Sequence, residues 1–202
     1  MELCPGGDLL SYVRKRRNLE EIKAKYIFRQ IIKAVAYLHK NLIVHRDIKL
    51  ENILLDGHGR IKIGDFGVSR KIEHQHEILF EQCGTPLYLA PEVVKEHGYL
   101  AAPIDIWCCG VCLWAMVIGK LPFGSPTEGK INYDLDFSDK KLSPDLKDLL
   151  QKILTTDMRA RLTAADILQH AWFADTPSYL DIFDEQEKEL ILSEFSLAPT
   201  TP

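Results

Sequence analysis

The longest run of helical periodicity in the chain lies between residues 22 and 40. Apolar residues recur there every three or four positions, and basic residues fall between them. The apolar positions are Ile27, Ile31, Ala34, Val35 and Leu38. We therefore predict an amphipathic helix that turns one stripe toward a core.

Three more helices are predicted from apolar runs and from capping residues. Residues 106–118 form an uncharged run of 13 residues, which is too short to span a bilayer and therefore favours a buried core helix. Ser143 and Pro144 are typical N-cap and first-turn residues of a helix with a leucine-rich face. Thr163 and Asp166 have the spacing of a capping box at the start of another helix.

Short strands are predicted around a group of polar residues in the middle of the chain. Residues 43–44 and 53–55 are apolar, residues 60–63 alternate, and the turn at 56–59 contains two glycines. Asp47, Lys49, Asn52 and Asp65 lie at the ends of these strands. The pattern therefore predicts a mainly helical domain whose candidate chemistry lies beside short β-hairpins.

Composition indicates one globular domain with an acidic tail. Of the 202 residues, 46% are hydrophobic and 27% are charged. Residues 175–202 hold seven acidic residues and one basic residue, a net charge of −6, so the other 174 residues carry +2 of the total −4. Neither value indicates nucleic acid as a partner, and no membrane partner is expected. Calmodulin targets are basic amphipathic helices, so the acidic tail does not support calmodulin binding.

Five cysteines, an odd number, argue against a secreted disulfide framework. Three of them lie inside the apolar run, where Cys109 and Cys112 are better explained as small buried residues than as a metal or redox pair. The start of the chain has no pattern of a signal peptide. We expect a reducing compartment, the cytoplasm, with nuclear entry left open.

The central polar residues suit phosphoryl transfer. Magnesium prefers hard oxygen ligands and takes only one or two from a protein, which Asn52 and Asp65 could supply. Asp47 could accept a hydrogen bond from a substrate hydroxyl and orient it. The ammonium of Lys49 could offset the charge on a transferring phosphoryl group.

These residues also carry a family resemblance. The pattern His45-Arg46-Asp47-x-Lys49-x-x-Asn52, followed by Asp65-Phe66-Gly67, resembles the catalytic and magnesium loops of eukaryotic protein kinases, and Lys49 resembles the serine/threonine class. The resemblance extends over residues 1–173 and is nearest to the calcium/calmodulin-dependent kinase group.

The resemblance implies a protein-kinase-like α+β fold represented by its mainly helical large lobe. It divides the chain into a hinge remnant (1–10), the large lobe (11–174) and the acidic tail (175–202). The implied cofactors are ATP and Mg²⁺, and the implied partners are protein substrates.

Further roles follow from matching positions. Glu2 and Cys4 would offer backbone groups to adenine, and Leu54 would lie beneath the base. Asp8 would lie near the ribose and, together with Glu51, would favour basic residues upstream of the target hydroxyl.

Other matching positions would support the catalytic loop. Thr85 would contact Asp47 and Lys49. Asp105 would brace the backbone of the loop, and Arg161 would pair with Glu92.

The segment between Ser69 and Thr85 contains no Ser, Thr or Tyr. In the resembling kinases an activating threonine often stands two positions before the Cys-Gly-Thr-Pro sequence, and here that position is Glu81. A phosphate there would pair with Arg46, so a fixed carboxylate could hold the loop without phosphorylation. The alternative is that Glu81 is one more acidic residue in a solvated loop.

The sequence departs from the kinase pattern in several places. It has no Gly-rich loop and no strand with the phosphate-reaching lysine, so we expect a fragment or truncated gene model of a longer kinase. The alternative is a non-catalytic, pseudokinase-like interaction module. A helix after Phe123 is expected to be shortened or lost. Residues 184–195 could form an acidic amphipathic helix, either a docking or autoinhibitory strip or a packed terminal helix.

Overall fold

Helix α2 (Glu21–Lys40) is the central element of the computed structural model, which describes residues 4–56, 59–94, 98–124, 131–138 and 142–175. Its predicted stripe is buried at Ile27, Ile31, Val35 and Leu38, while Ala34 is half-buried. Glu21 fixes its first turn, because the carboxylate accepts bonds from the backbone N–H of Ser143 (3.1 Å) and from Trp172 Nε1 (2.7 Å). The first turn of α2 is therefore bonded to two residues of the last described segment, Ser143 and Trp172.

Helix α4 (Ala101–Ile118) packs against α2 and forms the middle of the core. It is 18 residues long, five more than the uncharged run, because it also includes Ala101 to Asp105. By length and composition it could cross a membrane, which corrects the expectation that it is too short, but 83% of it is buried inside the fold. The helix is therefore a core helix, as expected, but the evidence for this is its burial and not its length.

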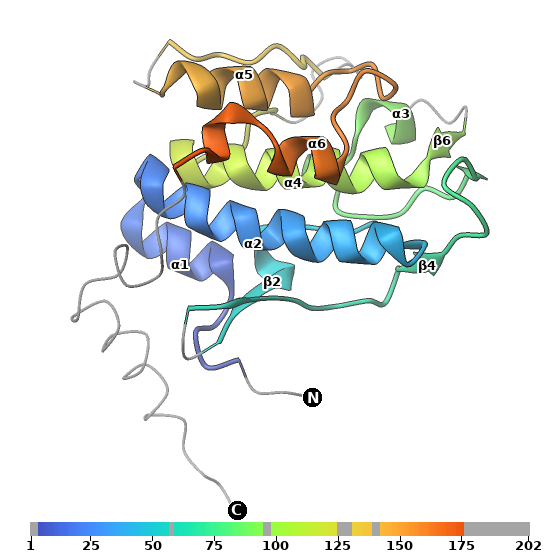
Figure 1. The fold of residues 1–202 in the computed structure, drawn as a ribbon, viewed down its shortest axis with the longest axis horizontal. Coiled ribbons are helices and arrows are strands. Elements are labelled where there is room, and N and C mark those ends of the chain that lie inside the picture. The colour runs from blue at the N-terminus through green and yellow to red at the C-terminus, as the bar shows by residue number, and fades with distance from the viewer. Residues whose placement is uncertain (1–3, 57–58, 95–97, 125–130, 139–141, 176–202) are drawn as a thin grey trace, which may run out of the picture.

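Other helices cover this pair. Helix α5 (Pro144–Ile153) packs on α4, and α6 (Ala164–Leu168) packs on α2 (Figure 1). Gly110 of α4 permits the close approach of α5, because a Cβ there would overlap Ile153. Both predicted caps are present: Ser143 Oγ accepts from the Leu146 N–H (3.2 Å), and Thr163 and Asp166 form the capping box.

The remaining elements are short. The helices are α1 (Leu9–Arg16) and α3 (Pro91–Val94), with 3-10 turns η1 (Leu50–Asn52), η2 (Pro86–Tyr88) and η3 (Ala171–Phe173). The strands are β1 (Ile43–Val44), β2 (Ile53–Leu55), β3 (Ile61–Ile63), β4 (Arg70–Lys71), β5 (Ile78–Leu79) and β6 (Tyr99–Leu100).

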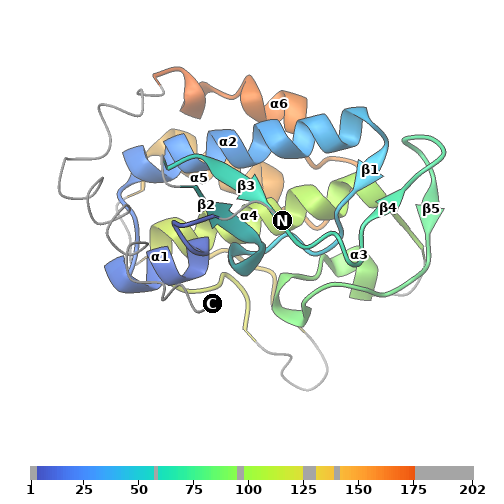
Figure 2. The same ribbon diagram turned by 90° about the horizontal axis from the view of Figure 1, so that it is seen from below.

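The strands pair into three antiparallel two-stranded sheets, β1 with β4, β2 with β3 and β5 with β6. The β2–β3 hairpin was predicted and places Ile53 opposite Ile63. Figure 2 shows it lying across the helical layer, where β3 contacts α2 and β2 contacts α1. Asp56 closes its turn by accepting bonds from Arg60 N and Nε, both 2.9 Å, while residues 57–58 lie outside the described chain. The hairpin thus packs on α1 and α2, with Asn52 directly before β2 and Asp65 shortly after β3.

Candidate active site

The loop after β1 is fixed by a buried carboxylate from α4. Asp105 is fully buried and accepts hydrogen bonds from the backbone N–H groups of His45 (2.9 Å) and Arg46 (2.8 Å). Arg46 has φ 67°, a conformation that is strained for a side chain other than glycine. The expected brace is therefore present, and it holds this turn against its conformational preference.

Three side chains meet directly after that turn. Lys49 Nζ lies 2.8 Å from Asp47 Oδ2 and 2.9 Å from Thr85 Oγ1, and the Thr85 hydroxyl donates to Asp47 Oδ1 at 2.7 Å. Asn52 Nδ2 donates to the backbone oxygen of Asp47 (2.9 Å) and more weakly to Oδ2 (3.2 Å). Residues from η1 and from the segment before η2 thus converge on one carboxylate.

The charges in this cluster reinforce one another. Partial burial would raise the pKa of Asp47, but the hydrogen bonds from Lys49 and Thr85 outweigh it and hold the pKa below its ordinary value. The bond to Asp47 raises the pKa of Lys49 against its partial burial. Both groups are therefore charged at neutral pH. A carboxylate in this state can accept a proton from a hydroxyl.

Asp65 reaches the same site through the hairpin. The Gly64 N–H donates to the Asn52 backbone oxygen (2.8 Å), and His45 Nε2 lies 2.9 Å from the Gly64 oxygen. Asp65 has φ 56° and an exposed side chain, and its charge contributes to the raised pKa of Lys49. The tertiary structure therefore brings Asp65 close to the Asp47 cluster.

The donor set fits magnesium. The Asn52 amide nitrogen donates to Asp47, and the amide oxygen has no hydrogen-bond partner among the described residues, so it could bind a cation. Asp65 is exposed, and the only bond to its carboxylate among the described residues comes from the Gly67 N–H (3.2 Å). No cluster of three or more Cys, His, Asp or Glu that could hold a metal occurs in the described part of the chain. Two hard oxygen ligands suit Mg²⁺, which takes its remaining ligands from phosphate and water.

The segment after Asp65 is held by a network of ion pairs. Glu81 Oε2 lies 2.8 Å from Arg46 Nη1, and Glu81 Oε1 lies 2.8 Å from Arg70 Nη1. Arg70 also contacts Glu77 (2.8 Å), and Arg46 Nε donates to the Val68 oxygen (2.6 Å). The bond from Arg46 lowers the pKa of Glu81, with Arg70 adding to the effect. Glu81 is thus bound by two guanidinium groups and does not project freely into solvent.

A buried ion pair joins this segment to the helical layer. Arg161 Nη1 lies 2.6 Å and Nη2 3.1 Å from the two carboxylate oxygens of Glu92. The Arg161 side chain has no exposed area and that of Glu92 has 9%. The pair expected from the sequence is present and bidentate.

The residues expected around a nucleotide base lie at the start of the chain and in β2. Glu2 lies outside the described residues. The Cys4 oxygen accepts a bond from the Gly7 N–H (3.2 Å), while Leu54, in β2, forms an isolated bridge with Asp8. These contacts bring the start of the chain to the hairpin, beside Leu54.

Asp8 has a structural role that the sequence interpretation missed. Its carboxylate caps α1 and accepts bonds from Ser11 N and Ser11 Oγ, both at 2.8 Å. The signal was available, because Asp followed by Leu-Leu-Ser is a reasonable helix start. Glu51 is exposed in η1, as a residue that contacts substrate could be.

Sequence reasoning also missed three residues of the site. His39 Nε2 lies 2.8 Å from Asp105 Oδ2, so α2 contributes to the brace of the loop. Arg70 and Glu77 complete the network around Glu81. No local pattern distinguishes these residues from ordinary surface charges, since their partners are distant in sequence. The helix expected to be shortened after Phe123 and the tail interpretation concern residues that lie wholly or partly outside the described chain.

Comparison with known proteins identifies the family of this chain. The family model for the protein kinase domain matches residues 1–173. The chain is 40% identical over 187 residues to a rye protein, the carbon catabolite-derepressing protein kinase, covering 90% of this chain and 37% of that protein. It is 39% identical over 176 residues to the probable serine/threonine-protein kinase MARK-C of Dictyostelium discoideum (85% and 23%).

A third relative is the serine/threonine protein kinase OSK3 of indica rice, which is 38% identical over 187 residues, 90% of this chain and 37% of the relative. The chain thus spans between 23% and 37% of the length of these three relatives. By the family model and by these identities, the chain belongs to the protein kinase domain family and, within it, to the serine/threonine kinases.

Proposed function

We propose that this chain is the large lobe of a protein kinase that transfers the γ-phosphate of ATP to serine or threonine hydroxyls of proteins. The observation that carries the proposal is the bonded group of Asp47, Lys49 and Thr85. In the transfer, the substrate oxygen bonds to the γ-phosphorus, the bond from that phosphorus to the β–γ bridging oxygen breaks, and Asp47 accepts the hydroxyl proton.

Asn52 and Asp65 would hold the metal, and Lys49 would neutralise charge on the transferring group. Magnesium, when bound, neutralises the phosphate oxygens and orients the γ-phosphate. Cys4 and Leu54 would contact the adenine base, and Asp8 would lie near the ribose. Because Asp8 already accepts two bonds from Ser11, any substrate contact there would use its remaining acceptor capacity.

Substrate preference, group and location are further parts of the proposal. The exposed Glu51, together with Asp8, favours substrates with basic residues upstream of the target hydroxyl. The Cys-Gly-Thr-Pro sequence at 83–86 supports affiliation with the calcium/calmodulin-dependent group. A cytoplasmic location is supported by the cysteines, all five of which are free.

Regulation without phosphorylation is supported by the network around Glu81. Arg46 belongs to the catalytic loop, so its pair with Glu81 connects that loop to the segment that carries Thr85. Arg70 binds the other carboxylate oxygen, which divides one negative charge between two guanidinium groups. A phosphate carries more charge and more acceptor oxygens than a carboxylate. Glu81 would therefore hold the segment more weakly than a phosphorylated residue, but it would do so permanently.

A covering lobe would explain the exposed apolar side chains next to Asp65. Phe66 is 45% exposed, although its ring packs against the His45 ring in a T-shaped arrangement, and Val68 is 37% exposed. Contacts with a second lobe would remove both from water. The Gly-rich loop and the phosphate-reaching lysine would belong to that lobe.

The test starts from the nucleotide sequence upstream of Met1. We expect an in-frame Gly-rich loop and a lysine-bearing strand, and transfer of phosphate from ATP to a basic serine peptide by the protein so encoded. Asp47→Asn should lower the rate by about 100- to 1000-fold or more, since it removes the proton acceptor and leaves the shape nearly unchanged.

Asp134→Asn is the matched control, because Asp134 is exposed and lies outside the cluster. Equal rates for Asp47→Asn and the unaltered protein would refute the proposal. A stop codon close upstream, together with no phosphate transfer, would instead favour a non-catalytic interaction module.

A further inference from the structure

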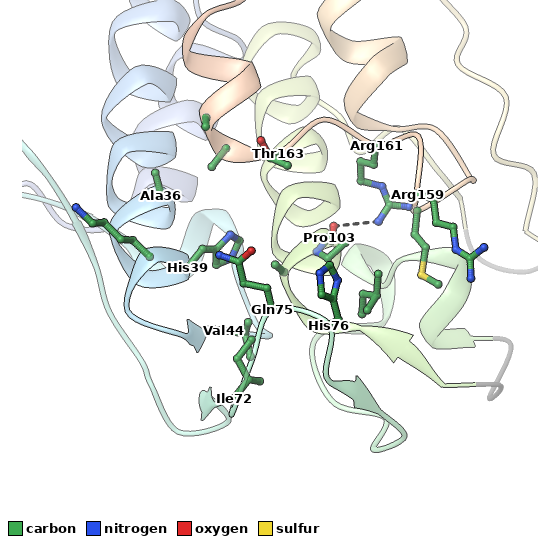
Figure 3. A pocket seen from close by; sticks show the side chains of 16 residues that line it. Ala36, His39, Val44, Ile72, Gln75, His76, Pro103, Arg159, Arg161 and Thr163 are labelled. Carbon is green, nitrogen blue, oxygen red and sulfur yellow. Dashed lines mark hydrogen bonds between the residues drawn. The ribbon is translucent and has the colours of Figure 1, made fainter.

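A cavity of about 660 Å³ lies at the C-terminal end of α2. Figure 3 shows its walls, which come from α2, the segment after β4 and the turn before α6, represented by Ala36, His39, Ile72, Gln75, Arg159 and Thr163. Its size is in the range of small-ligand sites, and no step of the proposed phosphoryl transfer uses it. The chemistry of its lining therefore indicates what it could bind.

The charge of the lining has one sign. None of the 16 lining residues is Asp or Glu. Lys40 and Arg159 are exposed and have no ion-pair partner among the residues that the structure describes. Arg161 also lines the cavity, but Glu92 already neutralises it. The described lining thus includes two cations without an ion-pair partner and no carboxylate.

The start of α4 adds partial positive charge. Leu100, Ala102 and Pro103 line the cavity, and α4 begins there with no side-chain cap and no acidic residue in its first turn. The free N–H groups of such a helix end favour carboxylates. The apolar part of the lining that remains accessible includes the half-buried Ala36, Leu100 and Met158. A fitting occupant has apolar side chains and several carboxylates.

We propose that this cavity is the docking site for the acidic C-terminal segment of the same chain, residues 184–195. This segment combines the two required properties. It has five acidic residues and four large apolar ones, namely Asp184, Glu185, Glu187, Glu189 and Glu194, with Leu190, Ile191, Leu192 and Phe195. Its one basic residue is Lys188.

The length of the connecting chain fits this docking. The bond between Trp172 Nε1 and Glu21 (2.7 Å) places the end of the described chain at the N-terminal end of α2, whereas the cavity lies at the C-terminal end. Helix α2 has 20 residues and is about 30 Å long. The nine residues from 176 to 184 reach about 30 Å when extended. The acidic segment therefore begins where an extended connection along α2 reaches the cavity.

Docking would act on the catalytic loop through one shared residue. His39 lines the cavity, and its Nε2 lies 2.8 Å from Asp105, which holds the His45 and Arg46 N–H groups. An occupant of the cavity would restrict the His39 side chain. The acidic segment would thereby stabilise the brace from the side opposite the catalytic loop.

Amide hydrogen exchange of the full chain tests the proposal. We expect residues 184–195 and 36–44 to be protected in the unaltered chain. Lys40→Glu with Arg159→Glu should accelerate exchange of residues 184–195 on the order of tenfold, because it places like charges together. Arg14→Glu with Lys33→Glu is the matched control, with two equivalent reversals at exposed sites that do not line the cavity.

A charge exchange makes the test specific. Adding Asp184→Lys and Glu187→Lys to the cavity variant should restore protection. If the cavity variant does not fold, Leu190→Ser with Ile191→Ser and Phe195→Ser, which changes none of the described core residues, should accelerate exchange at 36–44.

Three results would overturn the proposal. They are an unprotected segment 184–195 in the unaltered chain, equal exchange in the cavity and control variants, and protection that rises with protein concentration, which would indicate a second copy as the occupant. None of these measurements involves ATP or phosphate transfer, so the result is independent of the proposed kinase activity.

Discussion

Aspartate residues show how the environment decides what a side chain does. Asp105 is fully buried and accepts two backbone N–H bonds, so it holds a loop. Asp47 is partly exposed and meets a hydroxyl and an ammonium, so it is available for proton transfer. Asp8 caps a helix, and Asp56 closes a turn. The residue type is the same in all four, and their hydrogen-bond partners differ.

We predict that Arg161→Met destabilises the fold by about 3–5 kcal/mol, because it leaves the largely buried carboxylate of Glu92 without its cation. The measurement is urea unfolding at neutral pH. Lys152→Met is the matched control, since Lys152 and its partner Asp148 are about half exposed, and its effect should stay within about 0.5 kcal/mol. Equal destabilisation by the two variants would contradict the prediction.

At the scale of residues, the sequence predicted contacts only where motifs fixed both partners. Arg161 with Glu92, and Asp105 with the catalytic loop, were expected from the kinase resemblance and are present. His39 was missed, because its partner is 66 positions away in the chain and no local pattern marks the pair.

At the scale of elements, helices were more predictable than strands. The helix at α2 was expected from residue 22 to 40 and is observed one residue longer. Its periodicity is long enough to identify it without tertiary contacts. Strands β4, β5 and β6 have two residues each and exist because a distant partner supplies the hydrogen bonds, so their sequences carry little signal.

We predict that the three cysteines of α4 resist alkylation in the folded chain. Cys108, Cys109 and Cys112 are buried, and burial raises the pKa of each thiol well above its ordinary value. Mass spectrometry after iodoacetamide treatment at pH 8 should find these three unmodified. The partly exposed Cys4 serves as the internal control for access, and urea should make all five reactive. Rapid modification in α4 without urea would contradict its burial.

We predict that Glu81→Gln increases protease cleavage in residues 68–85, because a neutral amide pairs more weakly with Arg46 and Arg70 than a carboxylate does. Glu73→Gln is the matched control in the same segment, since Glu73 is also exposed and forms no ion pair within the described residues. Equal cleavage of the two variants would leave Glu81 as an ordinary solvated acid.

The ion pairs of Glu81 with Arg46 and Arg70 also predict how protease cleavage of residues 68–85 depends on pH. The pKa of Glu81 lies below its ordinary value of 4.5 in the folded chain, so its contribution to loop order is fully present above that value. The contribution is lost as the pH falls through the lower, folded pKa. Cleavage of the unaltered chain should therefore rise only below pH 4.5, whereas Glu81→Gln should show no such step. A rise between pH 5 and 7 would contradict this assignment.

At the scale of the molecule, the helical layer holds segments that are far apart in sequence in one site. Asp105 from α4, Asp65 after β3 and Thr85 before η2 all meet the loop after β1. The fold thereby gathers these groups around the loop that carries Asp47. A Gly-rich loop with its lysine is not among the residues of the chain.

We predict that the 202-residue chain alone binds Mg-ATP weakly or not at all. At millimolar Mg-ATP its Tm should change by less than about 1 °C, because a ligand stabilises a protein only in proportion to its occupancy. Thermal shift with and without nucleotide measures this. A saturable shift of several degrees for the chain alone would contradict the prediction.

The sequence by itself determined the family, the long helices, two helix caps and the polar residues of the site, because each depends on residues close together in the chain or on a fixed motif. The tertiary structure decided the remaining features. It added Arg70 to the expected pair of Glu81 with Arg46, used Asp8 as a cap and formed the cavity beside His39. These features depend on contacts between elements, and local patterns of hydrophobic and polar residues do not specify which elements meet.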